Sequence, residues 1–142
     1  MDFIYPTNVL FNCSKCGLCC GDTEQRTRRI LLLESEANDI SAKTHQPKQA
    51  FTTDLRNTAP YRYEMKKTSQ GKCLFLKDDN DCAIYSTRPL ICRFYPFELK
   101  FLKDKGRYGF EFTLECPEIG KGKKFTKKDF EQLFILAKEK LC

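Results

Sequence analysis

Nine cysteines in a chain of 142 residues constrain what this sequence can fold into more than any other feature. Four of them crowd into one short segment, Cys13-Ser-Lys-Cys16-Gly-Leu-Cys19-Cys20. This density exceeds what a fold needs for small buried apolar side chains, so the thiols bind a metal ion, bind an iron–sulfur cluster or form disulfides. The remaining five are spread along the rest of the chain, at Cys73, Cys82, Cys92, Cys116 and Cys142.

The cellular compartment helps to decide between these three uses of cysteine. The N-terminal segment MDFIYPTNVLF lacks the basic stretch, the apolar run and the cleavage site of a secretory signal. No apolar run approaches the roughly 20 residues that span a bilayer. We therefore expect a cytoplasmic protein without a membrane partner, in which thiols stay reduced. The odd cysteine count and the adjacent Cys19 and Cys20 also argue against a disulfide framework, which leaves metal or cluster ligation.

Two kinds of thiolate centre fit the spacing. Cys13, Cys16 and Cys19 form a C-x2-C-x2-C run, which opens the cluster motifs of bacterial ferredoxins, whose next ligand precedes a proline. The only Cys-Pro dipeptide of this sequence is Cys116-Pro117, far along the chain. Zinc fits the same residues, because tetrahedral four-cysteine sites are also built from C-x2-C turns. We favour a 4Fe–4S cluster, with zinc as the alternative.

The adjacent pair Cys19 and Cys20 bears on the number of centres. Neighbouring side chains of an extended segment point to opposite faces, so the pair serves two centres more easily than one. Two adjacent ligands on one centre need a tight turn, and in a third arrangement one thiol ligates while the other packs. Eight cysteines without the terminal Cys142 would fill two four-thiolate sites, or one centre with spare thiols. The sequence does not choose between these arrangements.

Several other function classes find no support in the sequence. The single histidine, His45, excludes Cys2His2 zinc fingers, His-rich catalytic zinc sites and Ser-His-Asp triads. It follows a predicted helix, so we expect a surface or helix-capping role for it. Neither a phosphate-binding P-loop nor a GxGxxG motif is present, and the CxxxCxxC spacing of radical-SAM enzymes is missing. The net charge of +6 is modest, and the basic run Lys121–Lys128 favours a solvated approach to a helix over a nucleic-acid site.

The hydrophobic pattern predicts an α+β fold, a small single domain over residues 1–142. In it, irregular loops around a metal or iron–sulfur site join short strands and a C-terminal amphipathic helix. We expect a first helix over about residues 35–43, with Ala37 and Ile40 inward, and a last one over about 126–141, where Thr126 and Asp129 resemble a capping box. Residues 46–59 have little pattern. Strands are predicted at Arg28–Leu33, Tyr61–Lys67 and Lys72–Leu76, and a hairpin at Leu99–Lys103 with Tyr108–Leu114.

Taken in order, the cysteine motifs resemble those of one family. Cys13-x-x-Cys16-x-x-Cys19-Cys20 is followed by Gly71-Lys72-Cys73-Leu74-Phe75-Leu76, Cys82-Ala83-Ile84-Tyr85, Arg88-Pro89-Leu90-Ile91-Cys92-Arg93-Phe94-Tyr95-Pro96-Phe97 and Cys116-Pro117-Glu118-Ile119-Gly120-Lys121-Gly122. This combination resembles the YkgJ-type cysteine-cluster family, also described as the CxxCxxCC zinc- or iron-chelating domain, from about Cys13 to Gly122. The chain departs from the family at Glu118, where many relatives have glycine.

The resemblance implies a site and a range of metals. Relatives include both iron–sulfur and zinc proteins, and flagellin lysine N-methylases are distantly similar, with the cysteine pattern beside additional sequence. The metal-binding and cofactor-binding set that the resemblance implies is Cys13, Cys16, Cys19, Cys20, Cys73, Cys82, Cys92 and Cys116.

Charged and aromatic residues flank Cys92. Arg88 and Arg93 bracket it, and their guanidinium groups would offset the negative charge of a thiolate centre without binding the metal themselves. The aromatic residues nearby are predicted to form an apolar wall of the core rather than substrate contacts, namely Tyr85, Phe94, Tyr95 and Phe97.

We expect a metal-binding protein that holds a 4Fe–4S cluster or zinc through cysteine thiolates, with a redox, sensing or metal-handling role and room for a protein partner. The first alternative is SAM-dependent methyl transfer to protein lysines, by analogy with the flagellin methylases. That analogy is weakened because the chain has no recognisable SAM-binding pattern and lacks the additional sequence. The second alternative is a zinc-stabilised nucleic-acid-binding module that uses Lys121–Lys128. The sequence leaves open whether the chain is an enzyme and names no catalytic residue.

Overall fold

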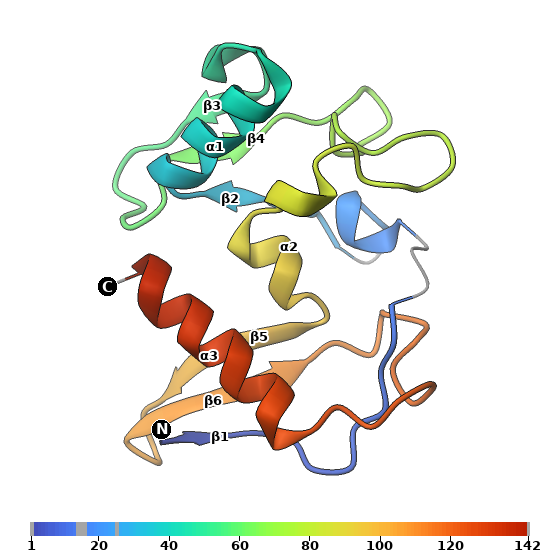
Figure 1. Ribbon diagram of the computed structural model, residues 1–142, viewed down its shortest axis with the longest axis vertical. Coiled ribbons are helices and arrows are strands. Elements are labelled where there is room, and N and C mark those ends of the chain that lie inside the picture. The colour runs from blue at the N-terminus through green and yellow to red at the C-terminus, as the bar shows by residue number, and fades with distance from the viewer. Residues whose placement is uncertain (1, 14–16, 25, 142) are drawn as a thin grey trace. The chain divides into compact units, whose positions relative to one another are not determined.

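The computed structural model describes residues 2–13, 17–24 and 26–141, and its internal contacts divide the chain into two compact units. The middle unit is Lys15–Arg93, and the terminal unit combines Met1–Ser14 with Phe94–Cys142. Short strands and helices give the α+β fold that the sequence predicts, whereas the single domain over residues 1–142 remains a prediction. The elements labelled in Figure 1 are β1 (Phe3–Ile4), β2 (Leu31–Leu32), α1 (Glu34–Thr44), β3 (Thr52–Asp54), β4 (Tyr63–Met65), α2 (Leu90–Phe94), β5 (Phe97–Leu102), β6 (Arg107–Phe112) and α3 (Lys127–Leu141).

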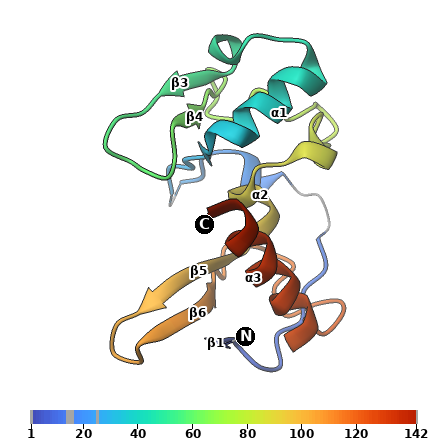
Figure 2. The ribbon, with the colours of Figure 1, turned by 60° about the vertical axis from the view of Figure 1, so that its left-hand side comes forward.

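A three-stranded antiparallel sheet and one helix form the framework of the middle unit. The strand order is β2-β4-β3, and α1 follows β2 directly and lies beside the sheet (Figure 2). Ala37 and Ile40 of α1 are fully buried, which confirms the predicted helix and its inner face. The helix ends at Thr44. His45 follows in a left-handed conformation, with a φ of 56° and an exposed side chain, in the capping position that the sequence predicts.

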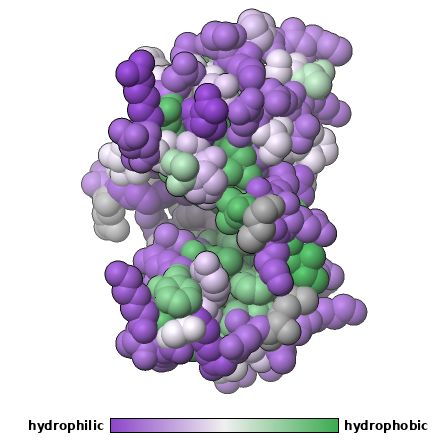
Figure 3. All heavy atoms as spheres, turned by 90° about the vertical axis from the view of Figure 1, so that its left-hand side faces the viewer, coloured by the Kyte–Doolittle hydropathy of each residue, from purple (hydrophilic) through white to green (hydrophobic). Residues whose placement is uncertain are grey.

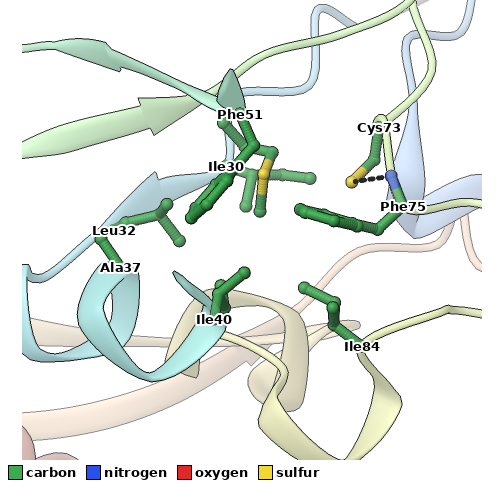
Figure 4. Close-up of a cluster of buried hydrophobic side chains, with 9 residues drawn as sticks. Ile30, Leu32, Ala37, Ile40, Phe51, Cys73, Phe75 and Ile84 are labelled. Carbon is green, nitrogen blue, oxygen red and sulfur yellow. Dashed lines mark hydrogen bonds between the residues drawn. The ribbon is translucent and has the colours of Figure 1, made fainter. Parts of the chain in front are cut away.

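The core of the middle unit reaches from α1 and the sheet into the loops that carry cysteines (Figure 4). Phe51 and Phe75 meet edge to face within it, with their ring centroids 5.5 Å apart. Because Cys73 belongs to this cluster, the apolar contacts that stabilise the unit also anchor a candidate ligand. The buried members are Ile30, Leu32, Ala37, Ile40, Phe51, Met65, Cys73, Phe75 and Ile84.

Several strand predictions for this unit need correction. The strands predicted over residues 28–33 and 61–67 shrink to β2 and β4, because the chain around both is irregular. The segment 46–59, predicted to lack pattern, contains β3 and the fully buried Phe51. A three-residue strand is too short to give a visible alternation of apolar and polar residues. The segment predicted over residues 72–76 pairs with its partner through a single bridge between Lys67 and Cys73.

The terminal unit is built on a second three-stranded sheet, in the order β1-β6-β5. β1 runs parallel to β6, so the start of the chain lies beside its later part. The β5–β6 hairpin confirms the prediction, although β5 begins two residues earlier than expected. In Figure 1, α3 crosses this sheet. Phe130 of α3 packs against Phe97 and Phe110, with ring centroids 5.0 and 4.9 Å away, so the core of this unit is largely aromatic.

The capping box predicted for the last helix is present. The Thr126 N–H donates to the Asp129 carboxylate over 2.8 Å, and the Asp129 N–H donates back to the Thr126 hydroxyl over 3.3 Å. These bonds satisfy N–H groups that the first turn of a helix leaves without an intrahelical partner. The helix begins at Lys127, one residue from the predicted boundary.

The surface seen in Figure 3 is mostly hydrophilic, with apolar side chains exposed in places. The β5–β6 hairpin contributes Phe101 and Tyr108, which stack edge to face at 5.2 Å and are 52% and 46% exposed. Isolated exposed apolar residues are normal on soluble proteins, so we assign these no function. Within residues 2–13, 17–24 and 26–141, no helix combines the length and the apolar character needed to cross a membrane.

A buried carboxylate connects α1 to α2. Glu36 is only 2% exposed, and one of its oxygens accepts the N–H of Leu33 at the start of its own helix, over 3.0 Å. The other oxygen accepts the N–H of Leu90, the first residue of α2. One side chain therefore caps both helices and fixes the helix that carries Cys92 against α1.

We predict that Glu36→Gln destabilises the protein by about 1–3 kcal/mol, because the amide accepts one N–H and places its own NH2 group against the other. The matched control is Glu34→Gln in the same helical turn. Glu34 is exposed and pairs with Arg62 at 3.4 Å, so its replacement should cost less than about 1 kcal/mol. Urea unfolding of the two variants and the wild type measures both changes. Equal losses would show that Glu36 does not connect the helices.

Candidate metal centre

Cys19 and Cys20 lie in a tight 3-10 turn, Leu18–Cys20, that begins after Gly17. Gly17 has a φ of 81°, and a Cβ there would come within 2.9 Å of the Asn80 side-chain oxygen, so both the conformation and the space favour glycine. The turn brings the two sulfurs to 3.8 Å from each other. The structure thus has the tight turn that two adjacent ligands on one centre require.

Backbone pairing joins this turn to the segment that carries Cys73. The N–H of Cys73 donates to the carbonyl of Cys20, and the N–H of Asp22 donates to the carbonyl of Gly71 over 2.9 Å. A Cβ on Gly21 would come within 3.0 Å of the same Gly71 oxygen. The close approach of the two backbones therefore depends on glycine at position 21 and holds Cys20 beside Cys73.

Cys73 and Cys82 lie on opposite arms of one loop. Cys82 forms a β-bridge with Leu76, and the N–H of Ala83 donates to the carbonyl of Phe75 over 2.8 Å. The N–H of Phe75 donates to the sulfur of Cys73 at 3.5 Å, the contact dashed in Figure 4. Because a hydrogen bond to sulfur favours its anionic form, this contact suits a thiolate ligand.

Cys92 is presented by the short helix α2, and two arginines hold the chain that leads into it. Arg93 donates to the carbonyl oxygens of Arg88 and Ser86, each over 3.0 Å. The Arg88 guanidinium lies 3.9 Å from the centroid of the Tyr85 ring and donates to the Tyr85 carbonyl. Arg93 therefore bonds backbone in the preceding turn, whereas Arg88 lies close enough for its charge to act on Cys19 and Cys82.

The aromatic residues around Cys92 do not form one wall. Tyr85 is 46% exposed and covers Arg88, so its assignment to the core was wrong. Phe94 and Phe97 are buried in the terminal unit, and Tyr95 is half-buried. Tyr85 differs because it faces a cation rather than the apolar cluster.

A third arginine, which the sequence analysis placed in a strand, lies within the site. Arg28 is buried, and its Nε donates to the carbonyl of Cys19 over 2.7 Å. Its own N–H donates to Asp22 over 2.7 Å, and its carbonyl accepts the ammonium of Lys67 over 3.1 Å. The Lys67 ammonium also binds the Asp22 carboxylate, at 2.8 Å. Through Arg28, this network is bonded to the backbone of the Cys19–Cys20 turn.

The five thiols of the middle unit influence one another electrostatically. The hydrogen bond from Cys20 lowers the pKa of Cys19 to about 6, with help from the charge of Arg28, whereas the same bond and burial raise the pKa of Cys20. Burial raises the pKa of Cys73 and Cys82, and it raises that of Cys92 to about 12. The charge of Cys19 adds to the rise at all four of the others, so they lie within its electrostatic reach.

The structure brings together five of the eight predicted ligands, all in the middle unit: Cys19, Cys20, Cys73, Cys82 and Cys92. Cys13, exposed, and Cys116, buried, belong to the terminal unit. Cys16, like the terminal Cys142, lies outside the described residues. Among the residues that are described, no three Cys, His, Asp or Glu side chains stand in a ready-made metal-binding arrangement.

The donors of the middle unit nevertheless suit a thiophilic metal. Zinc–sulfur bonds of about 2.3 Å in a tetrahedron place neighbouring sulfurs about 3.8 Å apart. Cys19 and Cys20 are separated by this distance, 3.8 Å. A preformed site is not required, because metal binding commonly completes a site that the metal-free chain holds only in part.

Comparison with known proteins decides the family. The model of the family described as "CxxCxxCC: Putative zinc- or iron-chelating domain" matches residues 12–129. The chain belongs to the CxxCxxCC family. The match confirms the resemblance seen in the sequence, and it includes all eight cysteines of the expected set but not Cys142.

One relative is similar over much of the chain. The uncharacterized protein MJ0661 of Methanocaldococcus jannaschii is 32% identical over 104 residues, which cover 72% of this chain and 53% of the relative. The chain therefore spans about half the length of the curated relative it matches. No solved structure matches it.

Four residues that hold the cysteine-bearing segments in place were not predicted from the sequence, namely Arg28, Asp22, Lys67 and Glu36. None belongs to a cysteine motif, and charged residues are usually exposed. Only Asp22 carried a signal, since it follows Cys20 and Gly21 directly.

We predict that Asp22→Asn destabilises the protein at neutral pH but not in acid. The Lys67 ammonium and then the Arg28 N–H hold the pKa of Asp22 below its usual range. The stabilisation is therefore complete above the unfolded-state pKa of about 4 and disappears as the pH falls through the lower folded-state value. The difference between the urea midpoints of wild type and variant should shrink below about pH 4. A chelator present in all samples keeps metal binding out of the comparison.

Asp39→Asn removes a carboxylate from an exposed position of α1 in the same unit and serves as the control. It should leave the urea midpoint near that of the wild type at both pH values. A constant difference between wild type and Asp22→Asn from neutral pH to pH 3 would contradict the role of the Asp22 charge.

Proposed function

We propose that the chain is a metal-binding protein whose centre is held by thiolates of the middle unit, in a redox, sensing or metal-handling role. The observation that carries this proposal is the position of Cys19. It lies within electrostatic reach of four other thiols and bonds the buried Arg28 through its carbonyl. Membership of a zinc- or iron-chelating family supports the same chemistry.

The kind of metal centre determines whether Cys19 and Cys20 both act as ligands. A single tetrahedral ion such as zinc takes both sulfurs, and their 3.8 Å separation supports this arrangement best. A 4Fe–4S cluster is the second candidate, supported by the C-x2-C-x2-C run of Cys13, Cys16 and Cys19. In that arrangement Cys13, Cys16 and Cys19 supply three thiolates and a distant cysteine supplies the fourth, so Cys20 would pack beside the cluster.

We expect anaerobic purification to yield a protein with roughly one zinc or iron ion per chain and no acid-labile sulfide. Elemental analysis, a sulfide assay and a visible spectrum measure these quantities. Several irons with an equal amount of sulfide and a broad visible absorption would identify the cluster instead. A folded protein with neither metal, which also fails to bind either on reconstitution, would refute the function.

Two single substitutions test the assignment of the thiols. On a single ion, Cys19→Ser and Cys20→Ser should remove most of the bound metal to the same extent, because each deletes one of four ligands. With a cluster, one of the two should retain it. Cys142→Ser, beyond the residues that match the family, is the control and should bind metal like the wild type. Wild-type metal content in both test variants would exclude the adjacent pair from the centre.

A further inference from the structure

Arg28 is held in place from several sides. Its backbone N–H donates to Asp22, its carbonyl accepts Lys67, and its Nε donates to the carbonyl of Cys19. The residue is 9% exposed, which is rare for an arginine. The neighbouring Arg29 differs in each respect, because its side chain is 54% exposed and pairs with Glu64 at 2.9 Å on the surface.

The charge of Arg28 acts on ligands from two separate elements. Its guanidinium lies within electrostatic reach of Cys19, in the tight turn, and of Cys92, in α2. The charge of Arg88 also reaches Cys19 and Cys82, but Arg88 is half-exposed and is covered by the exposed Tyr85. A buried cation is screened less by water than an exposed one, so Arg28 has the stronger hold on the charge of the site.

We propose that Arg28 is a positioning residue of the metal centre, which fixes the backbone of the Cys19–Cys20 turn and offsets the negative charge of the bound thiolates. This inference rests on the proposed function. Four thiolates around a divalent ion carry a formal charge of −2, and a buried excess charge is costly unless an opposite charge lies near it. Arg28 supplies that charge from inside the unit without binding the metal, as outer residues of metal sites commonly do.

The guanidinium has two separable properties, its charge and its planar array of donors. Arg28→Met removes both while keeping an unbranched apolar stem of similar burial. Arg28→Lys keeps the charge but loses the fork that reaches the Cys19 carbonyl. Comparing the two variants therefore separates the contribution of the charge from that of the donor array. Arg29→Met serves as the control, because it removes an arginine from the adjacent surface position.

Zinc affinity of the full-length chain, measured by competition with a chromophoric chelator, tests the proposal. We expect Arg28→Met to weaken zinc binding about 10- to 100-fold. Arg28→Lys should recover part of that loss, and Arg29→Met should stay within about threefold of the wild type. The visible spectrum of the cobalt(II) form should retain its thiolate bands in all three, because no ligand is removed.

The outcomes distinguish failure of the proposed function from failure of the role of Arg28. A wild-type chain that binds neither zinc nor cobalt overturns the proposed function. Tight binding by the wild type and equally tight binding by Arg28→Met overturn only the role of Arg28. Equal weakening by Arg28→Met and Arg28→Lys overturns the contribution of its charge and supports the contact with the Cys19 backbone. If Arg28→Met does not fold, the zinc affinities of Arg28→Lys and Arg29→Lys are compared instead. Weaker zinc binding in the position-28 variant alone supports the role of Arg28, whereas unchanged zinc binding in that variant overturns it.

Discussion

The candidate site depends on the backbone pairing between the Cys19–Cys20 turn and the segment that carries Cys73. Two hydrogen bonds, from Cys73 to Cys20 and from Asp22 to Gly71, hold together parts of the chain some fifty residues apart. Around this pairing, Lys67 and Arg28 bind Asp22, and the buried core reaches Cys73. Since each partner is a loop rather than a regular strand, neither would keep its shape without the other.

A metal would add to a unit that has little regular structure of its own. The sheet of the middle unit consists of strands of two or three residues, and its core is one cluster beneath a single helix. The loops that carry Cys73 and Cys82 are joined by single bridges rather than ladders. Ordering such loops costs conformational entropy that few apolar contacts offset, so ligation by several loops at once would stabilise the fold as well as the site.

Local patterns allowed much of this structure to be predicted, and long-range contacts account for most of what was missed. The cysteine motifs led to the family, and the apolar face with its Thr126 and Asp129 cap predicted α3. The role of Glu36 could not be foreseen, because its second partner, Leu90, is 54 residues away and no periodic pattern relates them. Arg28 resembled a strand residue, since its burial depends on loops that fold around it. How Cys13 and Cys116 relate to the other thiols remains a prediction.

Charges within the middle unit divide the thiols into two kinds before any metal binds. Cys19, with a pKa lowered to about 6 by Cys20 and Arg28, is a thiolate at neutral pH. Cys73, Cys82 and Cys92 keep their protons, because burial without a positive partner of comparable strength penalises the anion. A metal ion bound by these thiols would therefore meet one anionic ligand first and would displace protons from the others. Ligation in this order would couple metal binding to proton release, so the affinity of such a centre would fall as the solution becomes acidic.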